Sequence, residues 1–361
     1  MANTFKTFLN SDIANVRTLL HEAIPITGTI VSGTYTDDGN IKTFAHGMFE
    51  AVYDYPYLSS SANHIFDITA GYSANSPLSA STNVQNAKKI NIYNQHAQIL
   101  YGYDLTGSIQ DFDRDGNTAG GGDKMTECFF LNFSRLLTKD EIKKGSFLLT
   151  VYTGSDDLLT LTHELDISDY GAATGYKVNS PAGEYGLLLT NSADTSDNAV
   201  GHIYYQAGIA VLTASVFSNA TNGDGDTDAD DFCAFGGPGE GPAGNVDGIV
   251  GVLTGSEIDN FADGIRNRFE NLDFNNTTEL NSTIYFCRAN TQDYNYSANP
   301  TYLTASKIRV KNSIPKAEPV SYITTVGLYS ADNELLAVAK LSEPLKKSPS
   351  NELTLRVRLD Y

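Results

Sequence analysis

The stretch YITTVGLYSADNELLAVAKL, residues 322–341, indicates the fold class of the chain. Its two halves, residues 322–329 and 335–341, are rich in β-branched, aromatic and aliphatic residues. The polar sequence SADN at residues 330–333 separates them and is typical of a turn. Two such runs joined by a short turn predict a β-hairpin.

Further strand-like runs lie on both sides of this hairpin. They are short apolar stretches separated by Gly, Asn and Ser, at residues 44–55, 64–72, 129–133, 146–152, 203–213, 283–289, 302–310 and 353–359. β-branched and aromatic residues in runs of this length favour strands. We therefore expect a mainly β fold: a β-sandwich or barrel-like body, plus a second C-terminal sheet packed by one amphipathic helix.

Three segments show helical periodicity instead. At residues 11–21, Ser11 stands at a capping position and Ile13, Val16 and Leu19 share one face. Residues 87–101 fit a helical face better than strict alternation. Residues 256–272 carry an apolar stripe that begins after Ser256, and this is the helix expected to pack on the C-terminal sheet.

These patterns predict four regions along the chain. Residues 1–23 form an N-terminal helical arm, and residues 24–218 form the β-rich body. Residues 219–248 combine an acidic run with a Gly/Pro-rich stretch and are expected to be an excursion from the fold. Residues 249–361 form a docking module made of a helix and a β-meander.

The composition narrows the class of function. The chain has 361 residues, with 24 Lys and Arg against 43 Asp and Glu, a formal charge of −19. A charge of this sign repels nucleic-acid phosphates and anionic lipid, so we expect neither nucleic acid nor membrane as a partner. The three cysteines are far apart and form no metal-binding spacing, so we expect free thiols.

Two acidic loops raise a calcium hypothesis, because Ca²⁺ binds several oxygen ligands from alternate positions of a tight loop. The first offers Asp111, Asp113 and Asp115, but Gly122 stands where the closing acid should be. The second offers Asn222, Asp224, Asp226, Asp228 and Asp231, but Ala220 holds its first position. A solvated acidic surface explains both loops as well, so we expect no cofactor, with calcium as the alternative.

Enzyme motifs are missing from the sequence. It holds no H-E-x-x-H and no G-x-S-x-G with partners for a nucleophile, and its glycine-rich GGGDKM departs from a P-loop at two positions. We therefore expect no enzyme. Large amphipathic rings and a terminal strand favour assembly with other chains. The candidate interface residues are therefore the tyrosines and the last apolar run: Tyr294, Tyr296, Tyr302, Leu353, Leu355, Val357 and Leu359.

The C-terminal third resembles a known group of proteins. Residues 286–310 read FCRANTQDYNYSANPTYLTASKIRV, with DYNYSANP at 293–300 as the distinctive core, and the chain ends in RVRLDY. Together with the opening NSDIANVRTLLHEAIPITGTIVSGTY from Asn10, these residues resemble virion structural proteins of contractile-tailed cyanophages. The GLYSADNELLAVAKL segment also resembles the baseplate-docking part of phage tail-fibre proteins. The acidic insertion at 219–248 has no counterpart in that group.

This resemblance implies a virion component of the neck, tail or baseplate, and it transfers no catalytic residue. We therefore expect a structural subunit, located in the virion, that assembles with copies of itself and with other virion subunits. The alternative is a calcium-dependent or carbohydrate-binding adhesin module on the particle surface. A glycan hydrolase is the third hypothesis, weakened by the lack of Trp for sugar stacking.

Overall fold

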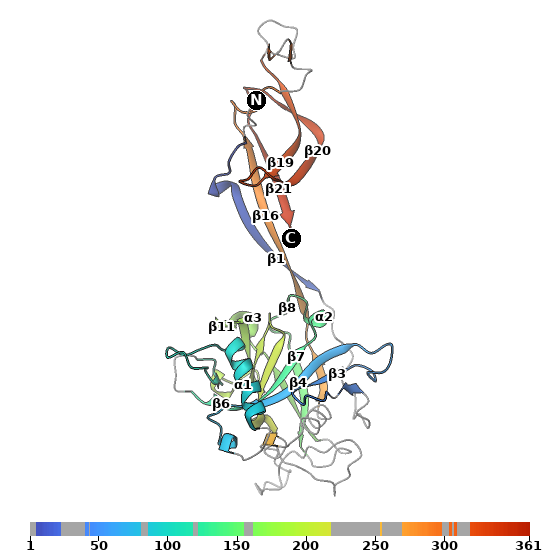
Figure 1. Ribbon diagram of the computed structural model, residues 1–361, viewed down its shortest axis with the longest axis vertical. Helices are drawn as coiled ribbons and strands as arrows, with labels where there is room; N and C mark the ends of the chain where they lie inside the picture. The colour runs from blue at the N-terminus through green and yellow to red at the C-terminus, as the bar shows by residue number, and fades with distance from the viewer. Residues whose placement is uncertain are drawn as a thin grey trace. The chain divides into compact units, whose positions relative to one another are not determined.

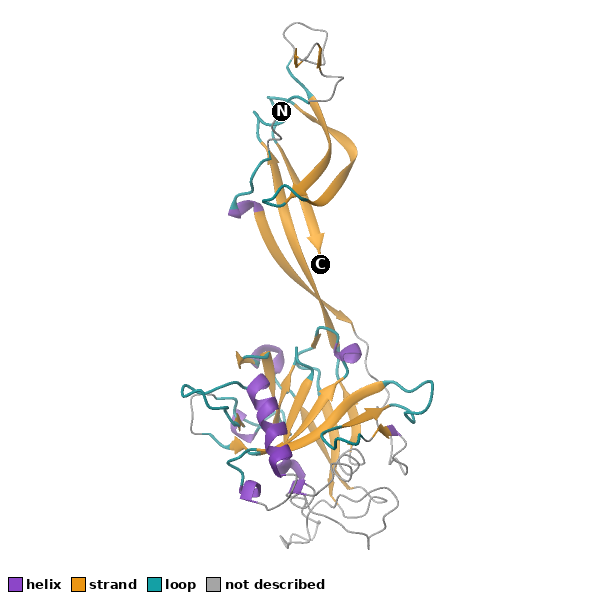
Figure 2. Ribbon diagram, in the orientation of Figure 1, coloured by secondary structure: helices purple, strands orange, loops and turns teal. Residues whose placement is uncertain are grey.

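The computed structural model describes most of the chain, in segments separated by gaps. The described residues are 5–22, 40–42, 44–80, 86–117, 122–154, 162–217, 253–254, 269–297, 303–304, 307–308 and 318–361. Two compact units divide the chain. We call Leu20–Thr278 the body, and we call Met1–Leu19 together with Glu279–Tyr361 the terminal unit. Both units are built mainly from antiparallel strands, so the predicted fold class is confirmed (Figure 2).

The largest element of the body is an eight-stranded antiparallel sheet (Figure 1). Its order is β11-β12-β13-β14-β7-β4-β3-β2. The strands are β2 (Ile41–Lys42), β3 (Glu50–Tyr53), β4 (His64–Tyr72), β7 (Glu127–Phe133), β11 (Lys177–Ser180), β12 (Gly183–Leu188), β13 (Gly201–Tyr204) and β14 (Ile209–Thr213). The central strands β4, β7 and β14 carry apolar residues on both faces. This predicts that other elements pack on both sides of the sheet.

A three-stranded sheet covers one face of the large sheet. It has the order β10-β9-β15, from β9 (Leu148–Gly154), β10 (Thr162–Ser168) and β15 (Phe269–Asp273). Aromatic rings join the two sheets, with ring centroids 5.8 Å apart between Phe66 and Phe269 and 5.1 Å apart between Phe133 and Phe274. The two sheets and the hydrophobic cluster between them form a sandwich.

Helix α1 (Asn86–Leu100) covers the opposite face, as its periodicity predicts (Figure 1). Its residues Tyr93 and Ala97 pack with Phe130 of β7 in a second buried cluster. Gly71 of β4 permits the close approach, since a Cβ atom there would lie 2.6 Å from the carbonyl oxygen of Lys89 and 2.7 Å from the amide nitrogen of Tyr93.

Several short elements complete the body. They are β5 (Phe112–Asp113), β6 (Lys124–Met125), β8 (Glu141–Ile142), α2 (Arg135–Thr138), α3 (Ala172–Gly175) and the 3₁₀ turns Pro77–Ala80, Ser196–Asn198 and Ala214–Phe217. None of the helices found in the described part of the chain has the length and apolar character needed to span a bilayer.

The terminal unit combines strands from both ends of the sequence. Its sheet has the order β1-β16-β21, from β1 (Ile13–Glu22), β16 (Asn276–Ala289) and β21 (Leu353–Asp360). Residues 20–22 of β1 and 276–278 of β16 belong to the body. Strands β19 (Ser321–Tyr329) and β20 (Leu335–Lys347) form a hairpin, and the turn predicted at residues 330–333 lies between them. The small pair β17 (Leu303–Thr304) and β18 (Lys307–Ile308) and a 3₁₀ turn at Asn10–Asp12 are its other described elements.

Three sequence predictions are corrected by this structure. Residues 11–21, predicted as a helix, instead form the end of the 3₁₀ turn Asn10–Asp12 and strand β1, because pairing with β16 outweighs the local helical periodicity. The N-terminal arm is therefore not helical. Residues 1–19 and 279–361 form one unit, so the predicted boundary at 248/249 moves to 278/279.

The end of the predicted helix at 256–272 is also corrected. Phe269–Asp273 is strand β15, where Phe269 and Leu272 are buried against β9 in the body. The preceding residues 255–268 lie outside the described part of the chain, as does the predicted excursion at 219–248.

Candidate assembly interface

The two faces of the β19–β20 hairpin differ in burial. In an antiparallel pair, directly opposed residues share a face. Val326 opposes Ala339 and Leu328 opposes Ala337, and these four side chains are buried or half-buried. We call this the inner face of the hairpin. Its alternation matches that expected of a strand with one covered side.

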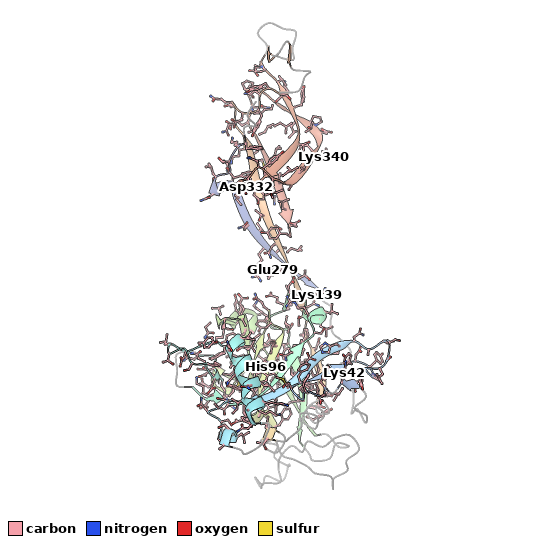
Figure 3. All side chains as sticks on the ribbon, viewed as in Figure 1. Lys42, His96, Lys139, Glu279, Asp332 and Lys340 are labelled. Atoms are coloured by element: carbon pink, nitrogen blue, oxygen red, sulfur yellow. The ribbon has the colours of Figure 1, made fainter. Side chains whose placement is uncertain are left out.

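The outer face of the hairpin is exposed and apolar. Val338, opposite Gly327, is 50% exposed, and its neighbour Leu336 is 67% exposed. Tyr322 and Tyr329 of β19 are exposed as well. Lys340 lies two residues further along β20, opposite Thr325 (Figure 3). A contiguous group of exposed apolar side chains on a strand is typical of an interaction surface.

Strand β1 exposes apolar side chains too. Ile13, Val16 and Leu19 are all more than a third exposed. The strand is held to β16 by an ion pair from the Nη2 atom of Arg17 to the Oε2 atom of Glu279, at 2.6 Å, besides backbone pairing. β1 is thus a fixed strand of the sheet, and its apolar side chains Ile13, Val16 and Leu19 contact water.

Strand β21 lies at an edge of its sheet. Among the described residues it pairs with β16 alone, from Ser282 opposite Asp360 to Ala289 opposite Leu353. The predicted interface residues Leu353, Leu355, Val357 and Leu359 share one face and are buried or half-buried, while the residues between them are exposed. An edge strand with a row of available backbone groups can add a strand from another chain.

A pocket of about 580 Å³ lies within the terminal unit. It is lined by the N-terminal segment, by β16 and by the inner face of the hairpin, including Phe5, Phe8, Cys287, Tyr294, Leu328 and Leu355. Cys287 and Cys128 are both free, as expected, and Cys233 lies outside the described residues. Burial raises the pKa of the Cys287 thiol, with a smaller contribution from Asp12.

The N-terminal segment forms one wall of this pocket through a few specific contacts. The Nζ atom of Lys6 lies 2.5 Å from the Oδ2 atom of Asp293, and the Nε atom of Arg288 lies 2.7 Å from Oδ1 of Asp12. Phe5 stacks obliquely on Tyr329, with ring centroids 4.8 Å apart. The hydrogen bond from Lys6 lowers the pKa of the Asp293 carboxyl.

Buried Lys347 holds together the loop that carries the DYNYSANP motif. Its Nζ atom donates hydrogen bonds to the carbonyl oxygens of Thr291, at 3.2 Å, and Ser348, at 2.9 Å, and to Oδ1 of Asn295, at 2.8 Å. All three donors of the ammonium group are satisfied by neutral oxygens. The Oγ atom of Ser321 donates to the carbonyl oxygen of Tyr294 and ties the same loop to β19.

The predicted tyrosines lie on or beside this loop. Tyr294, in a left-handed conformation with φ of 53°, and Tyr296 are both about half exposed. Tyr294 also lines the pocket. Tyr302 lies outside the described residues. Thus Tyr294 and Tyr296 are available to another chain, while Asn295 between them is buried and fixes the loop.

Sequence reasoning missed Lys347 and the ion pair between Arg288 and Asp12. Lys347 follows another lysine, Lys346, in a polar stretch, and nothing in that pattern distinguishes the buried residue from the exposed one. The Arg288–Asp12 pair joins residues 276 positions apart, so no local pattern could predict it.

The first acidic loop lies in the body and has partners of its own. Asp111 accepts hydrogen bonds from the Oγ atom of Ser73, at 2.6 Å, and from Nδ2 of Asn75, at 2.7 Å. Asp113 is fully buried and forms an ion pair with Lys124. Asp115 accepts a hydrogen bond from the amide nitrogen of Asn117 at 2.7 Å.

The structure does not bring these carboxylates into a metal-binding group. Within the described residues, no cluster of three or more His, Cys, Asp or Glu side chains is arranged to hold a metal ion. The second loop, with Asn222, Asp224, Asp226, Asp228 and Asp231, lies outside the described part of the chain.

A titratable group that the sequence did not single out, His202, lies fully buried in the body. Its Nε2 atom lies 3.4 Å from the carbonyl oxygen of Arg114, and its ring packs on Tyr185 with centroids 5.2 Å apart. Burial lowers the pKa of His202 to about 4. The imidazole is therefore neutral at pH 7 and belongs to the packing of the body.

Comparisons with known proteins add no assignment to this geometry. No protein-family model matches the chain, and neither the curated proteins nor the solved structures include a match.

Proposed function

We propose that this chain is a structural subunit of a phage virion, in the neck, tail or baseplate region, and that its terminal unit is the assembly element. One observation carries the proposal: the terminal unit exposes apolar strand faces and has little core. Both buried hydrophobic clusters lie in the body. The buried hydrophobic residues described in the terminal unit are only Ile284, Ala289, Leu328 and Val357.

The physical argument concerns burial. A unit of about 100 residues ordinarily needs a continuous apolar core to be stable. Here the same strands that build the unit keep Leu336, Val338 and Val16 in water. Another protein chain can cover them, and their burial then contributes roughly 1.5–3 kcal/mol for each large side chain that becomes fully buried. In this proposal the chain binds and assembles, and it turns over no substrate.

The resemblance supports the same location on the chain. The DYNYSANP motif begins at Asp293, which binds Lys6 of the N-terminal segment, and the motif's Asn295 accepts from Lys347. The RVRLDY ending forms most of β21. The residues that resemble phage virion proteins are thus those that organise the pocket and the free edge of the terminal unit.

Incorporation into particles tests this proposal. Purified virions of the phage that encodes the chain are expected to contain it at a fixed ratio to the other structural proteins. Deletion of residues 353–361 removes β21 and is expected to abolish incorporation. The double variant Leu336→Asp with Val338→Asp leaves β21 intact and should do the same, because it places charges on the apolar outer face.

The matched control is Leu58→Asp with Leu136→Asp in the body. These residues are 86% and 88% exposed and add the same charge outside the terminal unit. The control is expected to enter particles like the wild type. Normal incorporation of the Leu336/Val338 variant, or absence of the wild-type chain from virions, contradicts the proposal.

A carbohydrate-binding adhesin is the second candidate, and one feature of the body favours it. The loop between β3 and β4 exposes Tyr55, Tyr57 and Leu58 side by side in sequence. Exposed tyrosine rings can stack on sugars. If this loop binds glycans, Tyr55→Ser and Tyr57→Ser should each weaken retention on the host's surface polysaccharide, measured by pull-down. Retention that is absent in the wild type removes this candidate.

A further inference from the structure

Charge is divided very unevenly between the two units. The terminal unit holds 12 Lys and Arg against 9 Asp and Glu, a formal charge of +3. The body holds 12 Lys and Arg against 34 Asp and Glu, a formal charge of −22. The acidic character of the whole chain therefore belongs to the body alone.

Exposed apolar side chains are distributed in the opposite sense. In the terminal unit eight of them lie on strands: Ile13, Val16 and Leu19 on β1, Tyr322 and Tyr329 on β19, and Leu335, Leu336 and Val338 on β20. The other five, Phe5, Leu9, Tyr294, Tyr296 and Tyr361, lie outside strands. Those of the body are scattered over the β3–β4 loop (Tyr55, Tyr57, Leu58), the loop after α1 (Tyr103, Leu105), helices α1 and α2 (Ile99, Leu136) and the edge strand β11 with the residue before it (Val178, Tyr176). Among the described residues, exposed apolar side chains on neighbouring long strands are thus found in the terminal unit, which also carries little net charge.

We infer that copies of this chain associate terminal unit against terminal unit, with the acidic bodies kept out of the contact by mutual repulsion. This inference rests on the proposed assembly function and names its first partner, a second copy of the chain. An apolar strand face is best covered by another apolar strand face, and among the described residues the terminal unit itself is where such a face occurs.

The charges decide between two arrangements of the copies. Contact between two terminal units brings together +3 and +3, a small cost, and keeps the −22 bodies apart. A head-to-tail contact would set +3 against −22, which is attractive, but it would press Leu336 and Val338 against a surface rich in carboxylates. Apolar burial favours the first arrangement.

The two arrangements predict opposite effects of salt. In the first, the dominant electrostatic term is repulsion between bodies, and NaCl screens it because the Debye length falls from roughly 14 Å near 0.05 M to roughly 4 Å near 0.5 M. The dissociation constant of the self-association should then fall by about fivefold or more over this range. Head-to-tail contact loses attraction with salt, so its dissociation constant should rise.

Sedimentation velocity of the full chain tests this inference, at about 0.05 M and about 0.5 M NaCl. The wild type should form oligomers that strengthen with salt. Leu336→Asp with Val338→Asp should be monomeric at both salt concentrations. The control Leu58→Asp with Leu136→Asp adds two charges to the body, so it should associate more weakly than the wild type at low salt and like the wild type at high salt. Circular dichroism confirms that each variant is folded.

A second pair of substitutions keeps the test independent of the apolar variant. Asp123 and Asp197 are exposed carboxylates on the surface of the body. Asp123→Asn with Asp197→Asn should strengthen association at low salt and have little effect at high salt. Weaker association at high salt in the wild type overturns the inference, as does a monomer under every condition.

Failure of this inference and failure of the proposed function give different results. A chain that is monomeric alone but enters virions through its terminal unit docks on other subunits, so the self-contact is wrong and the virion role stands. A chain that forms salt-strengthened oligomers but is missing from virions has the self-contact without the virion role.

Discussion

The body and the terminal unit follow the same β-sheet pattern but differ in what covers it. In the body, β7 alternates between two buried clusters, with Phe129 on one side and Phe130 on the other, and another layer of the same chain covers each face. In the terminal unit, β20 alternates in the same way, yet Val338 remains half exposed. Alternation therefore predicts a strand but does not say whether its cover comes from within the chain.

This difference separates stability from assembly. The body holds the buried aromatic rings that give a domain its free energy of unfolding. The terminal unit is held mainly by backbone pairing and by polar contacts such as those of Lys347. Four predictions, ordered by expected size, test this difference between the units.

The largest effect is expected in the body. Phe129 is fully buried between the two sheets, so Phe129→Ala should lower the free energy of unfolding by roughly 3–5 kcal/mol. Phe5 in the terminal unit is the matched position, and Phe5→Ala should cost less than about 1 kcal/mol because its ring is already 45% exposed. Urea denaturation measures both. Equal losses would contradict the contrast between the units.

The next effect depends on pH and also belongs to the body. The pKa of His202, about 4 when folded, lies below its unfolded value near 6.5, so the unfolded chain binds the proton more readily as pH falls. Its contribution is present above pH 6.5 and lost toward pH 4, a total of about 3 kcal/mol. His202→Gln should flatten the pH dependence of unfolding by this amount. An unchanged slope contradicts it.

A smaller effect is expected at the motif loop of the terminal unit. Lys347→Met leaves Asn295 Oδ1 and the carbonyl oxygen of Thr291 without their donor, and should cost roughly 1–3 kcal/mol. Hydrogen exchange should accelerate at residues 290–297 and stay unchanged in the body. Lys346→Met, the same change at the exposed neighbour, is the control and should stay within about 0.5 kcal/mol.

The smallest effect is expected at the ion pair of the N-terminal segment. Lys6 and Asp293 are each more than a third exposed, so Lys6→Gln should cost no more than about 0.2–1 kcal/mol, and less at high salt. The pKa of Asp293 should return toward its ordinary value, which NMR titration measures. A cost like that of Phe129→Ala would show that the segment contributes a core after all.

The local sequence pattern predicted those elements that have a clear helical periodicity or a distinctive turn sequence. Helix α1 and the β19–β20 hairpin are of this kind, because helical periodicity and the SADN turn are local signals. Strand β1 was predicted as a helix, since its apolar residues at every third position fit a helical face, and only pairing with β16 more than 250 residues away makes it a strand.

The role of the candidate interface residues stays a prediction, but some of their positions follow from the sequence pattern. Alternation placed the apolar residues of β21 on one face, and tyrosine-rich sequence indicated Tyr294 and Tyr296 as exposed. The uneven division of charge could not be predicted, because it follows from which segments share a unit. The pocket is likewise lined by residues from both ends of the sequence. No local segment therefore contains all the residues that line it.

The order of the strands in the terminal unit also determines when its sheet can form during translation. β16 is flanked by β1, made early in translation, and by β21, made after residue 352. The body is complete in sequence by residue 278, so it can fold on the ribosome while β21 is still unsynthesised. A chain truncated before residue 353 therefore has a folded body but lacks β21, so β16 loses one of its two long partner strands.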